Sequence, residues 1–558
     1  MRSVILKYKK LICSEYQYVT EYNSLPGEQV LLSERFTQPL ILQRHRDQKE
    51  REEEIRFSGE SFQQVLNSRS SLESDHLNTL FNVDHHGISP SAVILQGNSG
   101  NGKSFTVQKI VMDWASCDLY KERFDIVFHL KCKEINRISG RKSLVEILSY
   151  NCSLTSDQIS QILQQAPEKV LFIIDGFDEL RLTQNIYDKS AQTDPLRKAP
   201  PVVTLCALMK GHILPESFLL VTTRSTATDT LGNLLKGPQR FTEIMGFTKK
   251  GVEEYFQKFF QNEELFRKAY ECVRANETLF TTCSIPVICW IICTVMRERF
   301  SAGADVLSGL GTTTSIYVDF VSTLLEHHCQ GLSQSVPNLL RSLGQLAERG
   351  ILEEQVLFDK KTVYETVSDP AGNPFLCKFL FKRRINQEIM FSFMHLSFQE
   401  FFTALYYISL DSKAFKGKLA KLRSDFYVWN SRSVAVMQFI SGLLNEDVRG
   451  TLRRKYGVFV HLNTQTYLKE LLFQMGSCVL NLHCLYELHE ESFVKEVLNG
   501  KADISVLYKP IRRTDCWALL YCCQCCQCMK KLMLHFAQIT FENLSMILPV
   551  LHKFETLM

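Results

Sequence analysis

The sequence predicts an α/β domain built on a parallel sheet, followed by several helical modules. Four short apolar runs, at residues 92–96, 124–130, 170–174 and 218–221, are rich in β-branched and aromatic side chains. Helical stretches separate them, and this alternation is typical of buried parallel strands. After about residue 245 the strand signal fades and helix-like segments dominate. The chain is therefore expected to place one sheet domain before its helical part.

Composition narrows the class of protein. The 558 residues are 45% hydrophobic, 11% aromatic and 22% charged. These values exclude a mostly disordered chain, a collagen-like repeat and a coiled-coil rod. At roughly 150 residues per domain, the length predicts about three to four domains. The net charge of +4 gives no electrostatic argument for a nucleic-acid partner.

Signals for membrane insertion or secretion are weak. The longest apolar run, residues 285–296, is about half of the roughly 20 residues that a spanning helix needs. The first ten residues hold too short an apolar core for a signal peptide. Most of the 19 cysteines lie among apolar neighbours, which indicates reduced thiols of a cytoplasmic protein. Lys7, Lys9 and Lys10 allow at most weak contact with an anionic membrane surface.

The segment before the first strong strand is polar. It contains a mixed charge run at residues 44–56, which we interpret as a solvated helix face or loop. Residues 58–90 are expected to form a linker to the sheet domain.

A complete phosphate-loop motif follows the first of the four apolar runs. The pattern G-x-x-x-x-G-K-[ST] is matched by Gly97, Asn98, Ser99, Gly100, Asn101, Gly102, Lys103 and Ser104. The glycines let the loop curl so that its backbone N–H groups face phosphates, and the following helix adds its positive dipole end. We expect Lys103 to reach the β- and γ-phosphates of ATP and Ser104 to bind Mg²⁺. The strand before the loop and the helix after it favour this over a structural glycine loop.

Two further strand ends carry the remaining chemistry. Residues 170–174 end at Asp175, which is expected beside Mg²⁺, with a strand-end cap as the alternative. Asp178 or Glu179, with Glu179 preferred, would polarise the attacking water. Arg224 ends another strand, where a guanidinium can contact a γ-phosphate and distinguish ATP from ADP.

Together these parts resemble the NACHT module of NOD-like receptors, most closely the pyrin-type and fish-specific subgroups. The stretches that carry the resemblance are residues 112–115, 171–180, 214–216, 284–290 and 393–402. The resemblance covers about residues 10–558. The N-terminal segment around Arg35 and Thr37 resembles the fish-specific NACHT-associated (FISNA) segment.

This resemblance implies a STAND/AAA-like P-loop NTPase followed by a helical domain, a winged-helix domain, a second helical domain and a stub of a leucine-rich repeat. The implied boundaries are 1–57 for the FISNA-like segment, 58–90 for the linker, 91–244 for the NACHT nucleotide-binding domain, 245–310 for helical domain 1, 311–410 for the winged-helix domain, 411–512 for helical domain 2 and 513–558 for the repeat-like start.

It also implies roles for four residues outside the phosphate loop. Pro286 would pack against adenine, and His395 would reach the β-phosphate of ADP and lock a closed form. Arg35 and Thr37 would lie near the adenine and ribose. Without the resemblance, the alternative for Pro286 is a helix breaker, and His395 is expected to be a core histidine.

The two ends of the chain leave alternatives open. One degenerate repeat cannot bury its own face, so we expect a short family member, a splice form or an incomplete gene model. A cysteine cluster occurs in the last segment, at Cys522, Cys523, Cys525, Cys526 and Cys528. It favours a buried helix of the repeat, with lipidation and metal binding as alternatives.

Two functions from different classes follow. The first is an ATP/ADP switch of innate immune, inflammasome-type signalling, in which nucleotide exchange opens a closed form. The open form is expected to associate with further copies of itself, with other NOD-like receptor chains and with signalling adaptors, and slow ATP hydrolysis would reset the switch. The alternative is a non-switching decoy or regulatory module that binds nucleotide for stability. A conventional ATP-driven motor is a weaker third class, because no substrate channel is evident.

Overall fold

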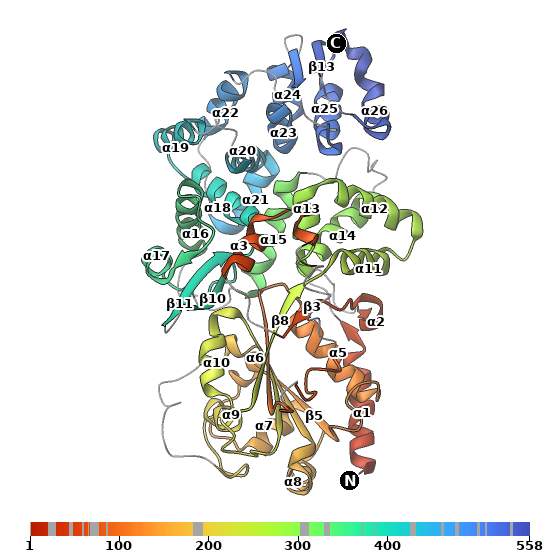
Figure 1. Ribbon diagram of the computed structural model, residues 1–558, viewed down its shortest axis with the longest axis vertical. Helices are drawn as coiled ribbons and strands as arrows, with labels where there is room; N and C mark the ends of the chain where they lie inside the picture. The colour runs from red at the N-terminus through yellow and green to blue at the C-terminus, as the bar shows by residue number, and fades with distance from the viewer. Residues whose placement is uncertain are drawn as a thin grey trace.

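The computed structural model describes residues 2–19, 29–43, 48–58, 61–64, 66, 77–84, 87–181, 193–301, 312–328, 335–370, 372–383, 386–424, 431–458, 462–474, 479–498, 503–507, 511–535 and 539–558. Figure 1 shows an elongated molecule with the sheet domain at one end and the C-terminal unit at the other.

A six-stranded sheet with the order β3-β8-β4-β7-β6-β5 forms the core of the sheet domain. Its strands are β3 (Leu40–Leu42), β4 (Ala92–Gly97), β5 (Ile126–Lys131), β6 (Val170–Asp175), β7 (Phe218–Thr223) and β8 (Gln239–Gly246). Neighbouring strands are parallel except for β3, which pairs antiparallel with β8. Strands β4 and β6 are buried along their whole length, so both faces demand apolar side chains. The predicted parallel sheet is confirmed, and the N-terminal segment adds its edge strand β3.

Helices cover this sheet and fix the strand ends. They are α5 (Lys103–Ala115), α6 (Cys132–Ile135), α7 (Leu144–Asn151), α8 (Ser156–Gln165), α9 (Pro201–Met209) and α10 (Thr228–Leu234). Helices α7 and α8 begin at complete capping boxes. The hydroxyls of Ser143 and Thr155 accept from the N3 backbone N–H, and their own backbone N–H groups donate to the N3 side chains. The N-terminal helix α1 (Arg2–Tyr16) packs along α5 (Figure 1).

The helical part follows the sheet. Its first group is α11 (Lys249–Phe260), α12 (Glu263–Ala275), α13 (Glu277–Thr282) and α14 (Pro286–Ser301). The winged-helix part contains α15 (Thr313–His328), α16 (Val336–Leu352), α17 (Lys360–Thr366) and α18 (Leu396–Ile408), with β9 (Phe358–Asp359), β10 (Leu376–Arg383) and β11 (Asn386–Phe393) in the order β10-β11-β9. The second helical group is α19 (Ser412–Ser424), α20 (Ser431–Leu443), α21 (Glu446–Tyr456), α22 (Leu462–Gln474), α23 (Val479–Leu488) and α24 (Glu491–Leu498). One continuous apolar core joins them to the C-terminal unit.

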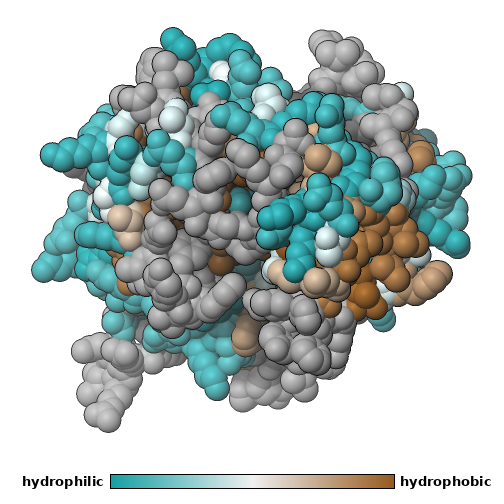
Figure 2. All heavy atoms as spheres, turned by 90° about the horizontal axis from the view of Figure 1, so that it is seen from above, coloured by the Kyte–Doolittle hydropathy of each residue, from teal (hydrophilic) through white to brown (hydrophobic). Residues whose placement is uncertain are grey.

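The C-terminal unit stacks three parallel strands, β12 (Asp503–Leu507), β13 (Met529–His535) and β14 (Phe554–Leu557). Helices α25 (Arg513–Cys525) and α26 (Phe541–Ile547) connect them. This strand–helix alternation begins at β12, before the predicted repeat start. Cys522, Cys523 and Cys525 are buried in α25, and across the described residues no group of three His, Cys, Asp or Glu side chains could hold a metal ion. Figure 2 shows an apolar patch on this end of the molecule. Within the C-terminal unit, Phe541 and Leu557 are exposed.

Helix α3 (Gln48–Arg56) lies within the charge run at residues 44–56, and it corrects the interpretation of that run as solvated at Arg51 and Ile55, which are buried. Arg51 is 6% exposed, and its Nη2 lies 2.7 and 2.8 Å from the two carboxylate oxygens of Glu243 on β8. Its guanidinium carbon lies 4.0 Å from the centroid of the Phe379 ring on β10. Helix α3 lies between the sheet domain and the winged-helix part, so the Arg51 side chain is buried (Figure 1). A buried charge needs a partner, and Glu243 supplies it.

The segment expected as a linker also packs more tightly than its polarity suggests. Leu80 and Phe81 are fully buried, and the Phe81 ring makes edge contacts with Phe124 and Phe218. The polar composition of residues 181–201 predicts a surface insertion, and residues 182–192 of that stretch lie outside the described part of the chain. Among the described helices, none has the length and apolarity that a membrane span requires.

Candidate nucleotide-binding site

The phosphate loop connects β4 to α5 and contacts helix α14. Gly100 and Gly102 have φ of +81° and +84°, which L side chains adopt only with strain. A Cβ at Gly100 would also lie 2.4 Å from Val287 Cγ1. The Val287 N–H donates to the Gly100 carbonyl at 3.2 Å. Glycine at position 100 therefore satisfies both a backbone conformation and a close approach to the helical part.

Lys103 begins α5 and turns its ammonium back onto the loop. Its Nζ donates to the carbonyls of Gly97 at 2.7 Å and Asn98 at 3.1 Å. Burial lowers the pKa of Lys103 to about 8, although the nearby Asp178 carboxylate opposes that shift. Asn101 Nδ2 donates to the Ile244 carbonyl at 3.1 Å and so fixes the loop to β8. The loop thus presents one ammonium group within a largely desolvated setting.

Asp175 ends β6 beside the phosphate loop. Its Oδ1 accepts a hydrogen bond from Thr222 Oγ1 at 2.6 Å, and its Oδ2 lies 3.8 Å from His129 Nε2. Burial raises the pKa of the Asp175 carboxyl, but the adjacent His129 ring and the hydroxyls of Thr222 and Ser104 outweigh it and leave the pKa below its ordinary value. The carboxylate is therefore ionised at neutral pH. Carboxylate and hydroxyl oxygens are donors that suit Mg²⁺.

Arg224 and the two acidic residues after β6 form a second charged group. Arg224 Nε lies 2.9 Å from Asp178 Oδ2, and its backbone N–H donates to Asp178 Oδ1 at 3.1 Å. Both side chains are buried. Glu179 faces Lys133, with 3.2 Å between Oε1 and Nζ, and burial raises the pKa of its carboxyl. Asp178 and Glu179 thus differ in environment, because Asp178 has a buried cation and Glu179 a half-exposed one.

These groups border a cavity of about 510 Å³, within the size range of small-molecule sites. Its wall includes the predicted residues Ser99, Gly100, Asn101, Gly102, Lys103, Ser104, Asp175, Asp178, Glu179, Arg224, Arg35, Thr37 and Pro286. Gly97 and Asn98 are not among the described residues of the wall, and their carbonyls accept bonds from Lys103. The loop, three strand ends, the N-terminal segment and α14 therefore meet at one site.

The N-terminal segment supplies one side of this wall. Helix α2 (Leu32–Arg35) ends at Arg35, whose guanidinium carbon lies 4.3 Å from the centroid of the Phe259 ring. Thr37 is 4% exposed, and its Oγ1 has no hydrogen-bond partner within the described part of the chain. The same holds for the buried Ser99 Oγ of the phosphate loop. Two buried hydroxyls without hydrogen-bond partners beside one cavity suit a polar ligand that bonds them.

Sequence reasoning missed the aromatic side of the cavity. Phe247, Tyr255 and Trp290 line it together with Pro286. Trp290 stood within a stretch that carried the resemblance, but Tyr255 lies on α11 among other apolar residues with helical spacing. Only the fold separates an aromatic cavity wall from an ordinary core face.

His395 is not among the described residues that line this cavity. It precedes α18 and is 8% exposed. Its Nε2 lies 2.9 Å from the Phe57 carbonyl and its Nδ1 2.7 Å from Ser397 Oγ. Burial lowers the pKa of His395. In this structure the histidine connects the winged-helix part to the end of α3, and its contact with a phosphate stays a prediction.

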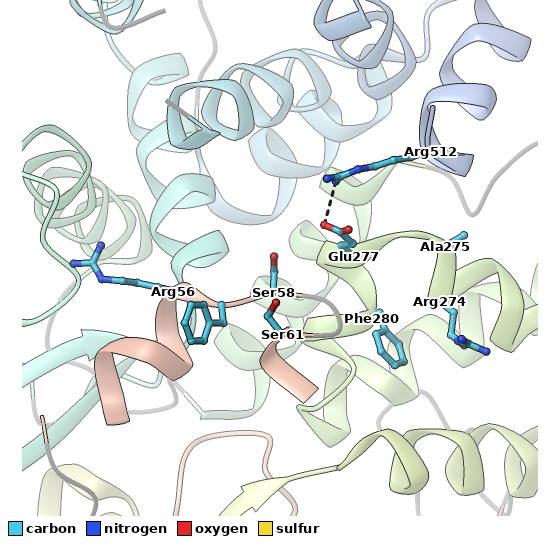
Figure 3. Close-up of a pocket in the computed structure, with 9 residues that line it drawn as sticks. Arg56, Ser58, Ser61, Arg274, Ala275, Glu277, Phe280 and Arg512 are labelled. Carbon is cyan, nitrogen blue, oxygen red and sulfur yellow. Dashed lines mark hydrogen bonds and ion pairs between the residues drawn. The ribbon is translucent and has the colours of Figure 1, made fainter. Parts of the chain in front are cut away.

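Figure 3 shows a second cavity, of about 460 Å³, between the end of α3, helices α12 and α13, and the start of α25. Arg512 Nη1 and Glu277 Oε2 form an ion pair of 3.1 Å across it. The side chains of Arg56 and Arg274 point in opposite directions in this view. The described arginines of this cavity therefore do not converge on a point where an anion could bind. The cavity lies where several helical modules meet.

Comparison with known proteins agrees with this geometry. The family model for the NACHT domain matches residues 91–263, the Fish-specific NACHT associated domain matches residues 8–77, and the NLRC4 helical domain HD2 matches residues 395–496. The phosphate loop, the mostly parallel sheet and the NACHT match define a nucleotide-binding protein of the P-loop NTPase class.

Similarity to relatives along nearly all of this chain then gives the family. The NACHT, LRR and PYD domains-containing protein 1 homolog of Danio rerio is 43% identical over 565 residues, which cover 96% of this chain and 41% of that protein. The NACHT, LRR and PYD domains-containing protein 3 of Homo sapiens is 31% identical over 555 residues, covering 95% of this chain and 53% of that protein. The chain belongs to the NACHT-domain family of NOD-like receptors. It spans about half the length of these relatives.

Similarity to solved structures is remote. The ORC2 protein of Aeropyrum pernix aligns over 59% of this chain and 89% of that chain, at 12% identity and a TM-score of 0.30. At that TM-score the alignment carries no argument about the site.

Proposed function

We propose that this chain is an ATP/ADP switch of innate immune signalling, in which nucleotide exchange converts a closed form into one that self-associates. The observation that carries the proposal is the cavity itself, because its wall comes from the phosphate loop, the N-terminal segment and α14. A ligand held there contacts several modules at once. The relative positions of these modules then depend on which nucleotide is bound.

The donor groups support a nucleoside phosphate with Mg²⁺. Lys103 and the loop N–H groups would bind the phosphates, and Ser104 and Asp175 would hold the metal ion. Mg²⁺ supplies charge neutralisation between the phosphates when it is bound. The aromatic wall and Pro286 would accept the adenine, with Arg35 and Thr37 beside the ribose. The depressed pKa of Asp175 keeps an ionised oxygen donor available.

The switch needs contacts that differ between ADP and ATP. Arg224 forms a buried ion pair with Asp178, and a γ-phosphate would compete with Asp178 for the guanidinium. His395 donates to the Phe57 carbonyl, and a β-phosphate contact would require that bond to break. In both cases a phosphate would replace a charged or polar partner of the side chain. The population of the closed form then shifts according to the difference between its affinity and that of the open form for the bound nucleotide.

Hydrolysis would be slow and would reset the switch. The Asp178 carboxylate faces Arg224, which leaves Glu179 as the better group to orient the attacking water. Its raised pKa favours a group that accepts a proton. The site would be at most a slow Mg²⁺-dependent ATPase.

The proposed partners are further copies of this chain, other NOD-like receptor chains and signalling adaptors. The relatives reported above carry domains named LRR and PYD, and assembly of such proteins in the cytoplasm is the setting that we propose for this chain. Contact with a membrane surface through Lys7, Lys9 and Lys10 would be weak, since Lys9 Nζ already donates to the Trp114 carbonyl at 3.1 Å.

The test is to purify the full chain, denature it, and identify and count the released nucleotide by chromatography. We expect about one ADP per folded chain, and conversion to larger oligomers by light scattering after exchange for ATP. Lys103→Ala should lose the nucleotide. Lys109→Ala removes a partly buried lysine of the same helix that pairs with Asp113 and is not among the described residues of the cavity wall, so it should keep the nucleotide. A folded wild-type chain without nucleotide would refute the proposal. Bound ADP with no change of oligomeric state would instead favour the non-switching decoy or regulatory module.

A further inference from the structure

The N-terminal helix α1 is fixed to the edge of the sheet domain. Tyr8 Oη donates to the Val127 carbonyl of β5 at 3.1 Å. Gln108 Nε2 on α5 donates to the Tyr16 carbonyl at 3.1 Å. The last residue of α1, Tyr16, is thereby placed against strand β5.

The Tyr16 hydroxyl reaches a buried histidine of that strand. Tyr16 Oη lies 2.8 Å from His129 Nδ1, and the two ring centroids are 5.7 Å apart. Burial raises the pKa of Tyr16 well above its ordinary value, so the hydroxyl stays a donor at neutral pH. A neutral His129 that accepts this bond at Nδ1 carries its proton on Nε2.

The sheet register directs that Nε2 toward Asp175. His129 pairs with Ile173 in the parallel ladder, and Asp175 pairs with Lys131, so His129 and Asp175 lie on one face of neighbouring strands. The His129 side chain is 5% exposed. Its Nε2 makes no hydrogen bond to the described residues and lies 3.8 Å from Asp175 Oδ2. On the other side, Thr222 Oγ1 binds Asp175 Oδ1 at 2.6 Å. The carboxylate therefore has a fixed polar group beside each of its oxygens.

We infer that Tyr16 and His129 are positioning residues for Asp175, and that through them the N-terminal helix influences Mg²⁺ binding at the nucleotide site. The inference rests on the proposed function, which assigns Asp175 to Mg²⁺. A carboxylate that is restrained on both sides presents its lone pair in one direction, and removal of such a partner typically costs about 10- to 100-fold in metal affinity. Tyr16 acts only through the imidazole, so its hydroxyl should matter less than the ring.

The experiment follows release of a fluorescent ADP analogue from the full chain into excess ADP at a series of buffered Mg²⁺ concentrations. The measured quantity is the Mg²⁺ concentration that gives half of the maximal slowing of release. We expect His129→Phe to raise it about 10-fold or more and Tyr16→Phe to raise it by a smaller factor. His129→Gln, which keeps an N–H donor near the position of Nε2, should restore most of the effect. The double variant Tyr16→Phe/His129→Phe should equal His129→Phe.

A matched control separates this role from a structural one. Tyr8→Phe removes a hydroxyl of the same helix that bonds the same strand at the Val127 carbonyl and not at the His129 ring, and it should leave the Mg²⁺ requirement unchanged. If the single variants Tyr16→Phe and His129→Phe both fold and both keep the wild-type Mg²⁺ requirement, the inference is overturned. An equal acceleration of release with and without Mg²⁺ would also overturn it. Failure of the wild-type chain to hold the analogue would refute the proposed function itself, and this inference with it.

Discussion

The buried ion pair between Arg51 and Glu243 gives the sharpest prediction about how the N-terminal segment is held. Arg51→Ala leaves the Glu243 carboxylate, on a side chain that is 3% exposed, without its cationic partner. Loss of one member of a buried pair costs about 3–5 kcal/mol. Loss of the stacking on Phe379 adds to this, since a desolvated cation–π contact is worth about 2 kcal/mol. Gln96 Nε2 still donates to Glu243 at 2.9 Å, which offsets part of the cost.

The assay is hydrogen exchange of the amides in α3, followed by mass spectrometry on the full chain. A local measurement is needed because a chain of several domains does not unfold in one two-state step. At a factor of ten for every 1.4 kcal/mol, a loss of about 3–5 kcal/mol predicts exchange at least about 100-fold faster when α3 opens locally.

The same helix offers a control. Lys49 pairs with Glu53 at 3.9 Å and is 86% exposed, so Lys49→Ala should change stability by less than about 1 kcal/mol. Arg51→Met/Glu243→Gln, which removes both charges, should recover much of the loss because no buried charge is left without a partner. Exchange of α3 in Arg51→Ala within threefold of wild type would refute the reasoning.

Three further predictions concern the cavity. Gly100→Ala should weaken nucleotide binding and lower the melting temperature, because its Cβ would lie 2.4 Å from Val287 on α14. Gly140→Ala is the control: φ is a similar +77° and no atom lies within 4 Å of the new Cβ, so it should show backbone strain alone, and equal effects of the two variants would contradict this account. Nucleotide association should weaken as the pH rises through about 8, because the pKa of Lys103 in the folded chain is lowered to that value and the ammonium form binds phosphate; a flat profile between pH 7 and 9, measured by stopped flow, would be inconsistent with it. Arg224→Ala should cost about 3–5 kcal/mol of stability by leaving buried Asp178 without its cation, and it should reduce the preference for ATP over ADP in competition binding; restoration of stability by Arg224→Ala/Asp178→Asn would support the cause.

Much of the sheet and the phosphate loop could be predicted because their signals are local. An apolar run bounded by turn residues identifies a buried strand, and a glycine pattern between strand and helix identifies an anion-binding loop. Asp175 and Arg224 followed from the same logic, since carboxyl ends of parallel strands meet at one edge. The cavity wall brings both of them together with Lys103.

Other features of the molecule depend on contacts between residues that are far apart in the sequence, and composition does not reveal those contacts. Arg51 looked like one charge in a solvated run, but its partner Glu243 lies 192 residues away. His129 looked like one residue of an apolar strand, and Tyr16 lies 113 residues before it. The resemblance implies a phosphate contact for His395. That contact stays a prediction, and in this structure its Nε2 bonds the Phe57 carbonyl.

The sequence by itself determined the class of protein, the phosphate loop and the strand-end carboxylate, because those depend on the conformation of a few consecutive residues. Only the tertiary structure decided that the N-terminal segment supplies an edge strand and a buried helix between modules. The physical reason is that the cost of burying a charge or a hydroxyl is set by whichever group packs against it. That group is chosen by the fold, and nothing in the neighbouring sequence encodes it.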